Sequence, residues 1–173
     1  MSTDISRIAL IGYRGSGKTS VGKALARMLS WEFIDTDALI TSREGRDVTA
    51  IFREHGEAYF RDRESAALVQ ALATANAVIA TGGGIIEREE NRERLRELSY
   101  VVYLSAPIEA LIARIEAGVD RPALTALPMK DEIRTVLARR IPLYERTAHG
   151  TLDTGEGSID DAAASVMRMM RET

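Results

Sequence analysis

The stretch Gly12-Tyr13-Arg14-Gly15-Ser16-Gly17-Lys18-Thr19 decides how this chain folds. It satisfies the pattern G-x-x-x-x-G-K-[ST], in which glycines let backbone amides curl around phosphate oxygens. A short apolar run at residues 8–11 precedes it, and apolar residues recur at helical spacing after Lys18. A buried strand, a glycine-rich turn and a helix in this order predict a phosphate-binding loop at a helix N-terminus.

The residues of this loop have separate expected tasks. Lys18 is expected to reach the β and γ phosphates of a nucleotide, and Thr19 to offer its hydroxyl to Mg²⁺. The predicted nucleotide-binding residues in this region are Gly12, Arg14, Gly15, Ser16, Gly17, Lys18, Thr19 and Ser20. The alternative is a turn that happens to end in Lys-Thr, but the flanking strand and helix argue against it. The motif predicts nucleotide binding but does not indicate which reaction the protein catalyses.

Apolar runs and helical patterns alternate along the rest of the chain. Further strands are predicted at residues 31–34, 77–80, 100–104 and 150–153. Helical patterns occupy residues 48–55, 57–74, 88–98, 107–116, 130–146 and 159–171. Strands alternating with helices predict a three-layer α/β domain around a parallel sheet. We expect residues 1–173 to form this single domain, with a long loop at 118–130.

The composition excludes several classes of protein. The chain has 173 residues, with 23 Lys and Arg against 26 Asp and Glu, so its formal net charge is −3. A protein that grips nucleic-acid backbone usually has a basic excess, so we expect no nucleic-acid partner. The lack of cysteine excludes disulfides, thiolate zinc sites and cysteine nucleophiles. No apolar run is long enough to span a bilayer and no secretory signal is evident, so we expect a cytoplasmic protein without a membrane partner. We also expect a monomer.

An acidic pair, Asp35 and Asp37, follows the second predicted strand. Residues two apart on an extended segment point the same way, so both carboxylates could face the crevice where open α/β sheets bind ligands. One carboxylate could help to hold Mg²⁺, and the other could accept a proton from an attacking hydroxyl or orient it. Asp37 could instead cap a helix. Downstream of a complete phosphate loop, the functional interpretation is favoured.

Two other classes of nucleotide-binding protein lack support. GTPases read guanine with an Asn-Lys-x-Asp element, but the only asparagines, Asn76 and Asn91, are not followed by lysine. Motor ATPases usually have an acidic residue at the end of a strand beside the first one. The strand predicted at 77–80 ends instead in Thr81 and three glycines. Among GTPases, motor ATPases and small-molecule kinases, the sequence therefore favours a kinase that acts on a small molecule.

The triple glycine and Arg61 are candidates for binding the acceptor. Glycines at 82–84 directly follow a buried strand and would let backbone amides approach a ligand, although a plain turn is the alternative. Glu57 and Glu64 lie four residues before and three after Arg61, so both could hold its side chain by ion pairs. Arg61 could then grip a substrate carboxylate with its planar fork; the alternative is a solvated surface arginine.

Together these residues resemble the shikimate kinase family, nearly from end to end. The matching pieces, in chain order, are the phosphate loop, Phe33-Ile34-Asp35-Thr36-Asp37, Ile51-Phe52, Gly56-Glu57, Phe60-Arg61 with Glu64, Gly82-Gly83-Gly84, Val102-Tyr103-Leu104, Arg121-Pro122-Ala123-Leu124 and Arg140-Ile141-Pro142-Leu143-Tyr144. Their order and spacing carry the resemblance. It implies a nucleoside-monophosphate-kinase-like fold with strand order 2-3-1-4-5, a substrate-binding subdomain at about residues 35–64 and a lid at about 116–130.

The resemblance also implies an activity and roles on the acceptor side. The activity is transfer of the γ-phosphoryl group of ATP to the 3-hydroxyl of shikimate, giving shikimate 3-phosphate and ADP, a step toward chorismate and the aromatic amino acids. Asp37 would contact the shikimate hydroxyls and act as base or orienting group. Arg61 and Arg140 would clamp the shikimate carboxylate, with the backbone of Gly82, Gly83 and Gly84 completing the pocket. For Arg140, the alternative is a helix-surface residue.

On the nucleotide side, the resemblance implies that Thr19 and Asp35 serve Mg²⁺, Asp35 through water. Arg121 in the lid would reach the phosphates on closure, and Arg114 would lie against the adenine, although an ordinary exposed helix charge is its alternative. Two features depart from the family pattern. Ala123 replaces a bulkier lid residue, and the loop at 153–157 lacks the arginine and proline common there, so adenine contacts in that loop would be mostly backbone.

Two other functions stay open. A gluconate kinase or another small hydroxy-acid kinase also needs arginines for a carboxylate; the context of Asp35 and Asp37 and the ordered pieces that follow favour shikimate. A regulatory module that binds ATP without turnover would be expected to lack Lys18, Asp37 or an acceptor-side arginine. None of these is missing.

Overall fold

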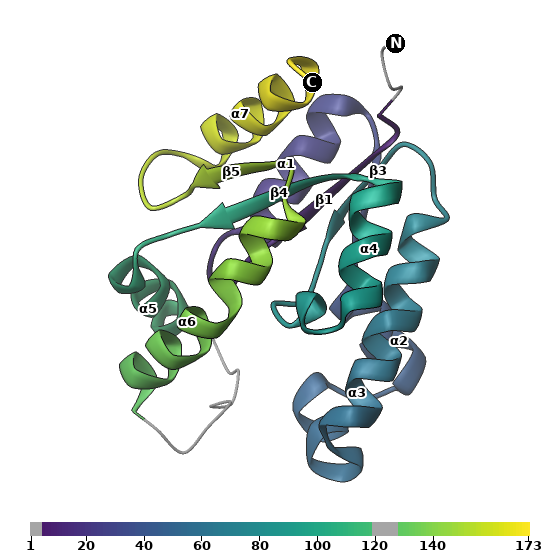
Figure 1. Ribbon diagram of the computed structural model, residues 1–173, viewed down its shortest axis with the longest axis vertical. Helices are drawn as coiled ribbons and strands as arrows, with labels where there is room; N and C mark the ends of the chain where they lie inside the picture. Colours follow the sequence, from purple (N-terminus) through teal and green to yellow (C-terminus); the bar gives the residue numbers. More distant parts are fainter. Residues whose placement is uncertain (1–4, 119–127) are drawn as a thin grey trace.

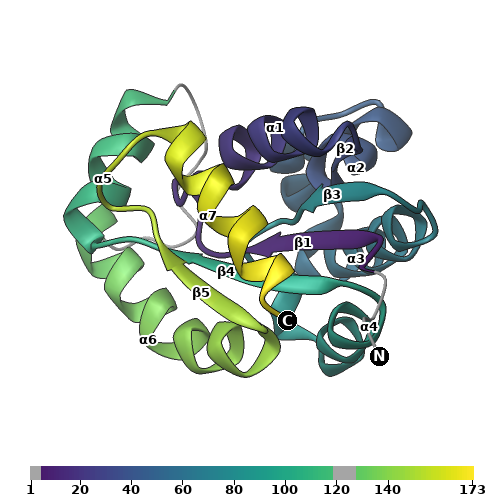
Figure 2. The ribbon, with the colours of Figure 1, turned by 90° about the horizontal axis from the view of Figure 1, so that it is seen from above.

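Five parallel strands form the central sheet of the molecule, which the computed structural model describes at residues 5–118 and 128–173 (Figure 1). They are β1 (Arg7–Ile11), β2 (Glu32–Asp35), β3 (Ala77–Ala80), β4 (Tyr100–Ser105) and β5 (Gly150–Asp153). Their order is β2-β3-β1-β4-β5, and Figure 2 shows them side by side in this order. Ile8 of β1 lies opposite Val78 of β3 and Tyr100 of β4. The expected α/β class and strand order are confirmed.

Helices cover both faces of the sheet, because the inner strands are apolar on both faces. Successive side chains of a strand point to opposite faces. Ile8 and Leu10 therefore face one core, which α1 (Lys18–Leu29) and α7 (Ile159–Arg171) complete. Ala9 and Ile11 face the other core. The helices that complete this second core are α3 (Val48–Leu72), α4 (Glu89–Leu98), α5 (Ile108–Ala117) and α6 (Met129–Thr147).

A helix follows β2 where an extended segment was expected. Helix α2 (Thr36–Glu44) begins directly after Asp35, whose Oδ1 accepts hydrogen bonds from the backbone N of Asp37 (2.9 Å) and of Ala38 (3.2 Å). The premise that Asp35 and Asp37 lie on one extended segment is therefore wrong. The capping residue is Asp35 rather than Asp37, because a short carboxylate at this position satisfies the first free amides of a helix.

Helix α3 contains a break at Gly56, where φ is 81° and ψ is 176°. Such a conformation favours glycine, because a Cβ would be strained there. The helices predicted on either side of this residue are thus two halves of one element. Ile40 of α2 packs with Ile51 and Phe60 from the two halves, forming a small core of its own. Apart from Ala67, the buried residues of this core lie within residues 35–64, which we predict to be the substrate-binding subdomain.

The remaining connections lie around the carboxyl ends of the strands. A short 3₁₀ helix, η1 (Ile85–Glu87), follows the triple glycine. Most of the predicted lid, with Arg121 and Ala123, lies outside the described residues, which end at Gly118 before the gap and begin again at Pro128. Within the described ranges, no helix is long and apolar enough to cross a membrane.

Candidate active site

A pocket of about 270 Å³ opens at the carboxyl ends of β1, β2 and β3. Its lining includes phosphate-loop residues, the acidic pair, two of the three glycines and one arginine from α5: Arg14, Gly15, Gly17, Lys18, Thr19, Ser20, Asp35, Asp37, Gly82, Gly83 and Arg114. These residues come from distant parts of the chain. They meet because parallel strands end at the same edge of a sheet, where open α/β proteins bind ligands.

The phosphate loop leaves backbone amides available at the N-terminus of α1. Gly17, the residue before the helix, has φ 95° and offers no side chain to cap it. Free N–H groups at a helix start and the helix dipole both favour an anion. The Lys18 ammonium spans the loop, donating to the carbonyl oxygens of Gly12 (2.7 Å) and Tyr13 (2.9 Å). Gly12 is required here, since a Cβ on it would lie 2.5 Å from the carbonyl oxygen of Leu104.

Asp35 and Thr19 place a carboxylate and a hydroxyl together beside the loop. The Thr19 hydroxyl donates to Oδ2 of Asp35 at 3.3 Å, while Oδ1 of Asp35 caps α2. Mg²⁺ prefers oxygen ligands and usually binds one or two protein groups together with phosphate and water. No cluster of three or more His, Cys, Asp or Glu suited to a metal occurs in the described part of the chain. One carboxylate and one hydroxyl beside a phosphate loop fit a magnesium ion that is held mainly by a nucleotide.

Asp37 and Glu64 converge on Gly82. A Cβ on Gly82 would lie 2.7 Å from Oε1 of Glu64 and 2.9 Å from Oδ1 of Asp37, so a side chain at this position would displace both carboxylates. Glu64 is 1% exposed. Burial raises the pKa of Glu64 above its ordinary value; Arg61 opposes this effect, and the charge of Asp37 adds to it. The sequence pattern indicated Glu64 only as a partner of Arg61, so its place in the site is a feature that the fold adds.

Arg61 is held by the two glutamates that its helix spacing suggested. Its Nη1 donates to Oε2 of Glu64 at 2.7 Å, and its Nη2 donates to Oε1 of Glu57 at 3.3 Å. The guanidinium lies against Gly84, where any Cβ would overlap it. The Arg61 side chain is only 12% exposed and its Nε has no hydrogen-bond partner. These observations contradict the alternative of a solvated surface arginine.

Arg140 lies on the other side of the triple glycine. It is 6% exposed, and its Nη1 would be 3.5 Å from a Cβ on Gly83. Its neighbour Arg139 has a side chain 64% exposed, so the surface position belongs to Arg139. Glu87, which the sequence analysis did not single out, accepts a hydrogen bond from Nε of Arg140 at 2.8 Å.

Two further arginines of the site hold neighbouring segments. Arg114 donates to the carbonyl oxygen of Gly15 (3.2 Å) and to the carbonyl oxygen of Thr154, so it joins the phosphate loop to the segment after β5. Arg114 is therefore more than an exposed helix charge. Arg14 forms an ion pair of 2.9 Å with Glu132 of α6, whose carboxylate is 1% exposed. No sequence feature near Glu132 indicated that it would pair with Arg14.

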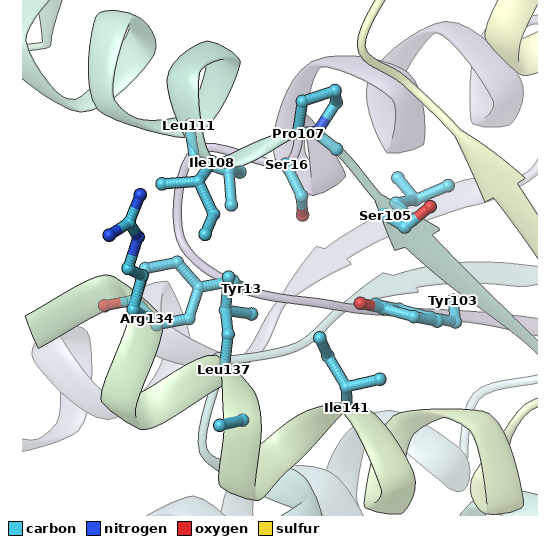
Figure 3. A pocket seen from close by; sticks show the side chains of 13 residues that line it. Tyr13, Ser16, Tyr103, Ser105, Pro107, Ile108, Leu111, Arg134, Leu137 and Ile141 are labelled. Atoms are coloured by element: carbon cyan, nitrogen blue, oxygen red, sulfur yellow. The ribbon is translucent and has the colours of Figure 1, made fainter. Parts of the chain in front are cut away.

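The Ser16 side chain faces a second cavity, of about 360 Å³, on the other side of the loop (Figure 3). The lining there is mainly apolar, with Leu111 from α5 above and Leu137 and Ile141 from α6 below. Ser16 is 1% exposed, and its Oγ has no hydrogen-bond partner. Any contact of Ser16 with a nucleotide therefore comes from its backbone.

Comparison with known proteins assigns the chain to a family. The family model described as shikimate kinase matches residues 14–171. The chain belongs to the shikimate kinase family. A shikimate kinase of Nitratidesulfovibrio vulgaris is 45% identical over 151 residues, which cover 86% of each chain. A shikimate kinase of Symbiobacterium thermophilum is 41% identical over 167 residues, covering 95% of this chain and 96% of that protein.

Solved structures of this family have the same fold. A shikimate kinase from Acinetobacter baumannii in complex with shikimate superposes with a TM-score of 0.93 at 36% identity, covering 98% of this chain and 94% of that one. A gluconokinase from Sinorhizobium meliloti has a TM-score of 0.54 at 19% identity. The second likeness reflects the fold alone, whereas the first extends to the family.

Proposed function

We propose that this protein transfers the γ-phosphoryl group of ATP to the 3-hydroxyl of shikimate, giving shikimate 3-phosphate and ADP. One observation carries the proposal. Asp37, Arg61 and Arg140 surround the triple glycine, directly beside a phosphate loop. A small acceptor with several hydroxyls and one carboxylate matches a carboxylate base next to a half-buried arginine, Arg61, and a buried one, Arg140.

On the nucleotide side, the loop amides and Lys18 bind the phosphates, and Arg114 lies beside the adenine. Thr19 and Asp35 would hold Mg²⁺, Asp35 through water, and the ion would neutralise phosphate charge when bound. Arg121 of the lid would reach the phosphates on closure, which also excludes water. Phosphoryl transfer asks the protein mainly for positioning and charge stabilisation, and these groups supply both.

On the acceptor side, Asp37 orients the attacking hydroxyl or accepts its proton. The free Nε of Arg61 and the Nη atoms of Arg140 are donors for the acceptor carboxylate. Glu64 and Glu57 leave Arg61 with fewer free donors but hold its guanidinium in place. We propose residues 35–64 as the substrate-binding subdomain and residues 116–130 as the lid of a monomeric enzyme.

An acceptor panel tests this function. Purified protein with ATP and Mg²⁺ is mixed with shikimate, quinate or gluconate, and ADP release is followed, with ³¹P NMR locating the new phosphate. We expect ADP release that depends on shikimate, and a product phosphorylated at the 3-hydroxyl. Faster turnover of gluconate would identify a gluconate kinase. Binding of both ATP and shikimate without ADP formation would identify a module that binds without turnover.

A further inference from the structure

The carboxylate of Glu87 lies between two consecutive arginines of α6. A single oxygen, Oε1, accepts hydrogen bonds from Nε of Arg140 at 2.8 Å and from Nη2 of Arg139 at 2.7 Å. Glu87 ends η1, three residues after the triple glycine, so this contact joins the glycine segment to a helix more than fifty residues away. The contact therefore sets where the Arg140 guanidinium lies relative to the backbone of Gly83.

The ion pair with Glu87 matters more for Arg140 than for Arg139. The Arg139 side chain is 64% exposed, and an exposed ion pair of this kind contributes little. The Arg140 side chain is 7% exposed, so its charge needs a fixed partner. Glu87 accepts from the Nε of Arg140, while Nη1 of the same guanidinium lies on the side of Gly83. The contact therefore restricts the orientation of the guanidinium.

The surroundings of the pair keep it charged and rigid. Burial alone would raise the pKa of Glu87, but hydrogen bonds and charge from Arg140, and then from Arg139, bring that pKa below its ordinary value. The Tyr144 hydroxyl donates to the carbonyl oxygen of Gly83 at 2.5 Å, one helical turn from Arg140. Tyr144 also interacts with Arg140. Glu87 is the partner that accepts the hydrogen bond from Nε of Arg140.

We propose that Glu87 is a positioning residue for the acceptor carboxylate, which it serves by fixing the orientation of Arg140. The inference rests on the proposed function, in which Arg140 binds that carboxylate. A long arginine side chain loses much rotational freedom when it binds in a single orientation. With Glu87 present, this loss occurs on folding rather than on substrate binding, which is how preorganisation strengthens affinity.

Steady-state kinetics with five variants test the role. The variants are Glu87→Ala, Glu87→Gln, Arg139→Ala, Arg140→Ala and the double variant Glu87→Ala/Arg140→Ala. We expect Glu87→Ala to raise the KM for shikimate about tenfold, with the KM for ATP changed by less than about twofold. Glu87→Gln keeps an oxygen that can accept from Nε, so its KM for shikimate should lie between those of wild type and Glu87→Ala. Arg139→Ala is the matched control and should change neither KM.

Two readouts separate positioning from a general structural role. If Glu87 acts through Arg140, the double variant should be no worse than Arg140→Ala, because coupled residues are not additive. Binding of the carboxamide of shikimate, which has no carboxylate, should be equally weak in wild type and Glu87→Ala. A structural role would instead weaken acid and amide together and raise the KM for ATP as well.

The outcomes distinguish this inference from the function on which it rests. If wild type does not phosphorylate shikimate, the proposed function falls and the inference falls with it. If wild type is active but Glu87→Ala keeps its KM for shikimate, only the inference falls. Additive losses in the double variant, or Glu87→Gln as impaired as Glu87→Ala, would also overturn it. Thermal unfolding of each variant shows whether a loss of activity reflects loss of the fold.

Discussion

The Thr19 hydroxyl donates to Oδ2 of Asp35 across 3.3 Å and so links the first turn of α1 to the end of β2. The other oxygen of Asp35 caps α2. One carboxylate thus serves the folding of the segment that carries Asp37 and, in the proposed function, the magnesium ion. The two tasks can be separated by substitution, because a cap needs only an acceptor oxygen whereas a cation favours a charge.

Asp35→Asn should therefore keep the stability of the protein but raise its magnesium requirement, about tenfold in the Mg²⁺ concentration giving half-maximal ADP release. Asp35→Ala should show the same loss and also lower the free energy of unfolding by about 1 kcal/mol. The matched control is Asp47, which caps α3 by accepting from the backbone N of Ala50 at 2.7 Å. Asp47→Ala should lower stability alone. An Asp35→Asn enzyme with an unchanged magnesium titration would exclude Asp35 from the metal site.

Asp37→Asn should collapse turnover by about 10²- to 10⁴-fold, the usual contribution of a general base. The affinity for ATP should stay nearly unchanged, because Asp37 lies beside Gly82 on the acceptor side. Calorimetric titration with ATP and measurement of kcat check the two halves of this expectation. Turnover within a few fold of wild type would remove Asp37 from the mechanism.

Arg61→Lys should raise the KM for shikimate by about tenfold and that for ATP much less. A lysine ammonium is a point charge, so it cannot contact Glu64, Glu57 and a substrate carboxylate in the same plane. Arg63→Lys is a suitable control, since that side chain is 47% exposed and pairs with Glu44 at 3.2 Å. Equal rises in both KM values would indicate general damage to the fold.

Protonation of His149 should destabilise the protein below about neutral pH. Its Nδ1 accepts a hydrogen bond from the backbone N of Val101 at 3.0 Å, and its ring stacks on Tyr100. Burial, and then the charge of Arg96, lower its pKa from 6.5. The unfolded state therefore takes up the proton first, so this stability is lost as pH falls from 6.5 through the lowered pKa.

Thermal unfolding of wild type and His149→Gln from about pH 7.5 to about pH 5, on both sides of the ordinary histidine pKa, checks this sign. Wild type should lose more stability toward low pH than the variant, because only wild type has the imidazole whose pKa is lowered by folding. The other histidine, His55, lies exposed on α3, and His55→Gln serves as the control. Parallel curves for wild type and His149→Gln would contradict the assignment.

Local patterns in the chain predicted much of the fold. The strand, turn and helix around Gly12 and Lys18 were predictable because each depends on neighbouring residues: an apolar run, glycines and helical periodicity. The ion pairs of Arg61 were predictable for the same reason, since Glu57 and Glu64 lie within one helical turn of it. The strand order came from the resemblance, and the start of α2 was missed because Asp35 can end a strand and cap a helix at once.

The pairing of residues far apart in the chain depends on the assembled fold. Local sequence patterns predicted a phosphate loop, an α/β domain and the arginines and aspartates that could serve a kinase. Which carboxylate meets which arginine depends on how the strands and helices assemble: Glu132 lies 118 residues from Arg14, and Glu87 lies 53 from Arg140. In this acidic chain, any of many glutamates could neutralise an arginine. Packing selects one of these glutamates, because a buried charge can pair only with a group that the folded backbone places within reach.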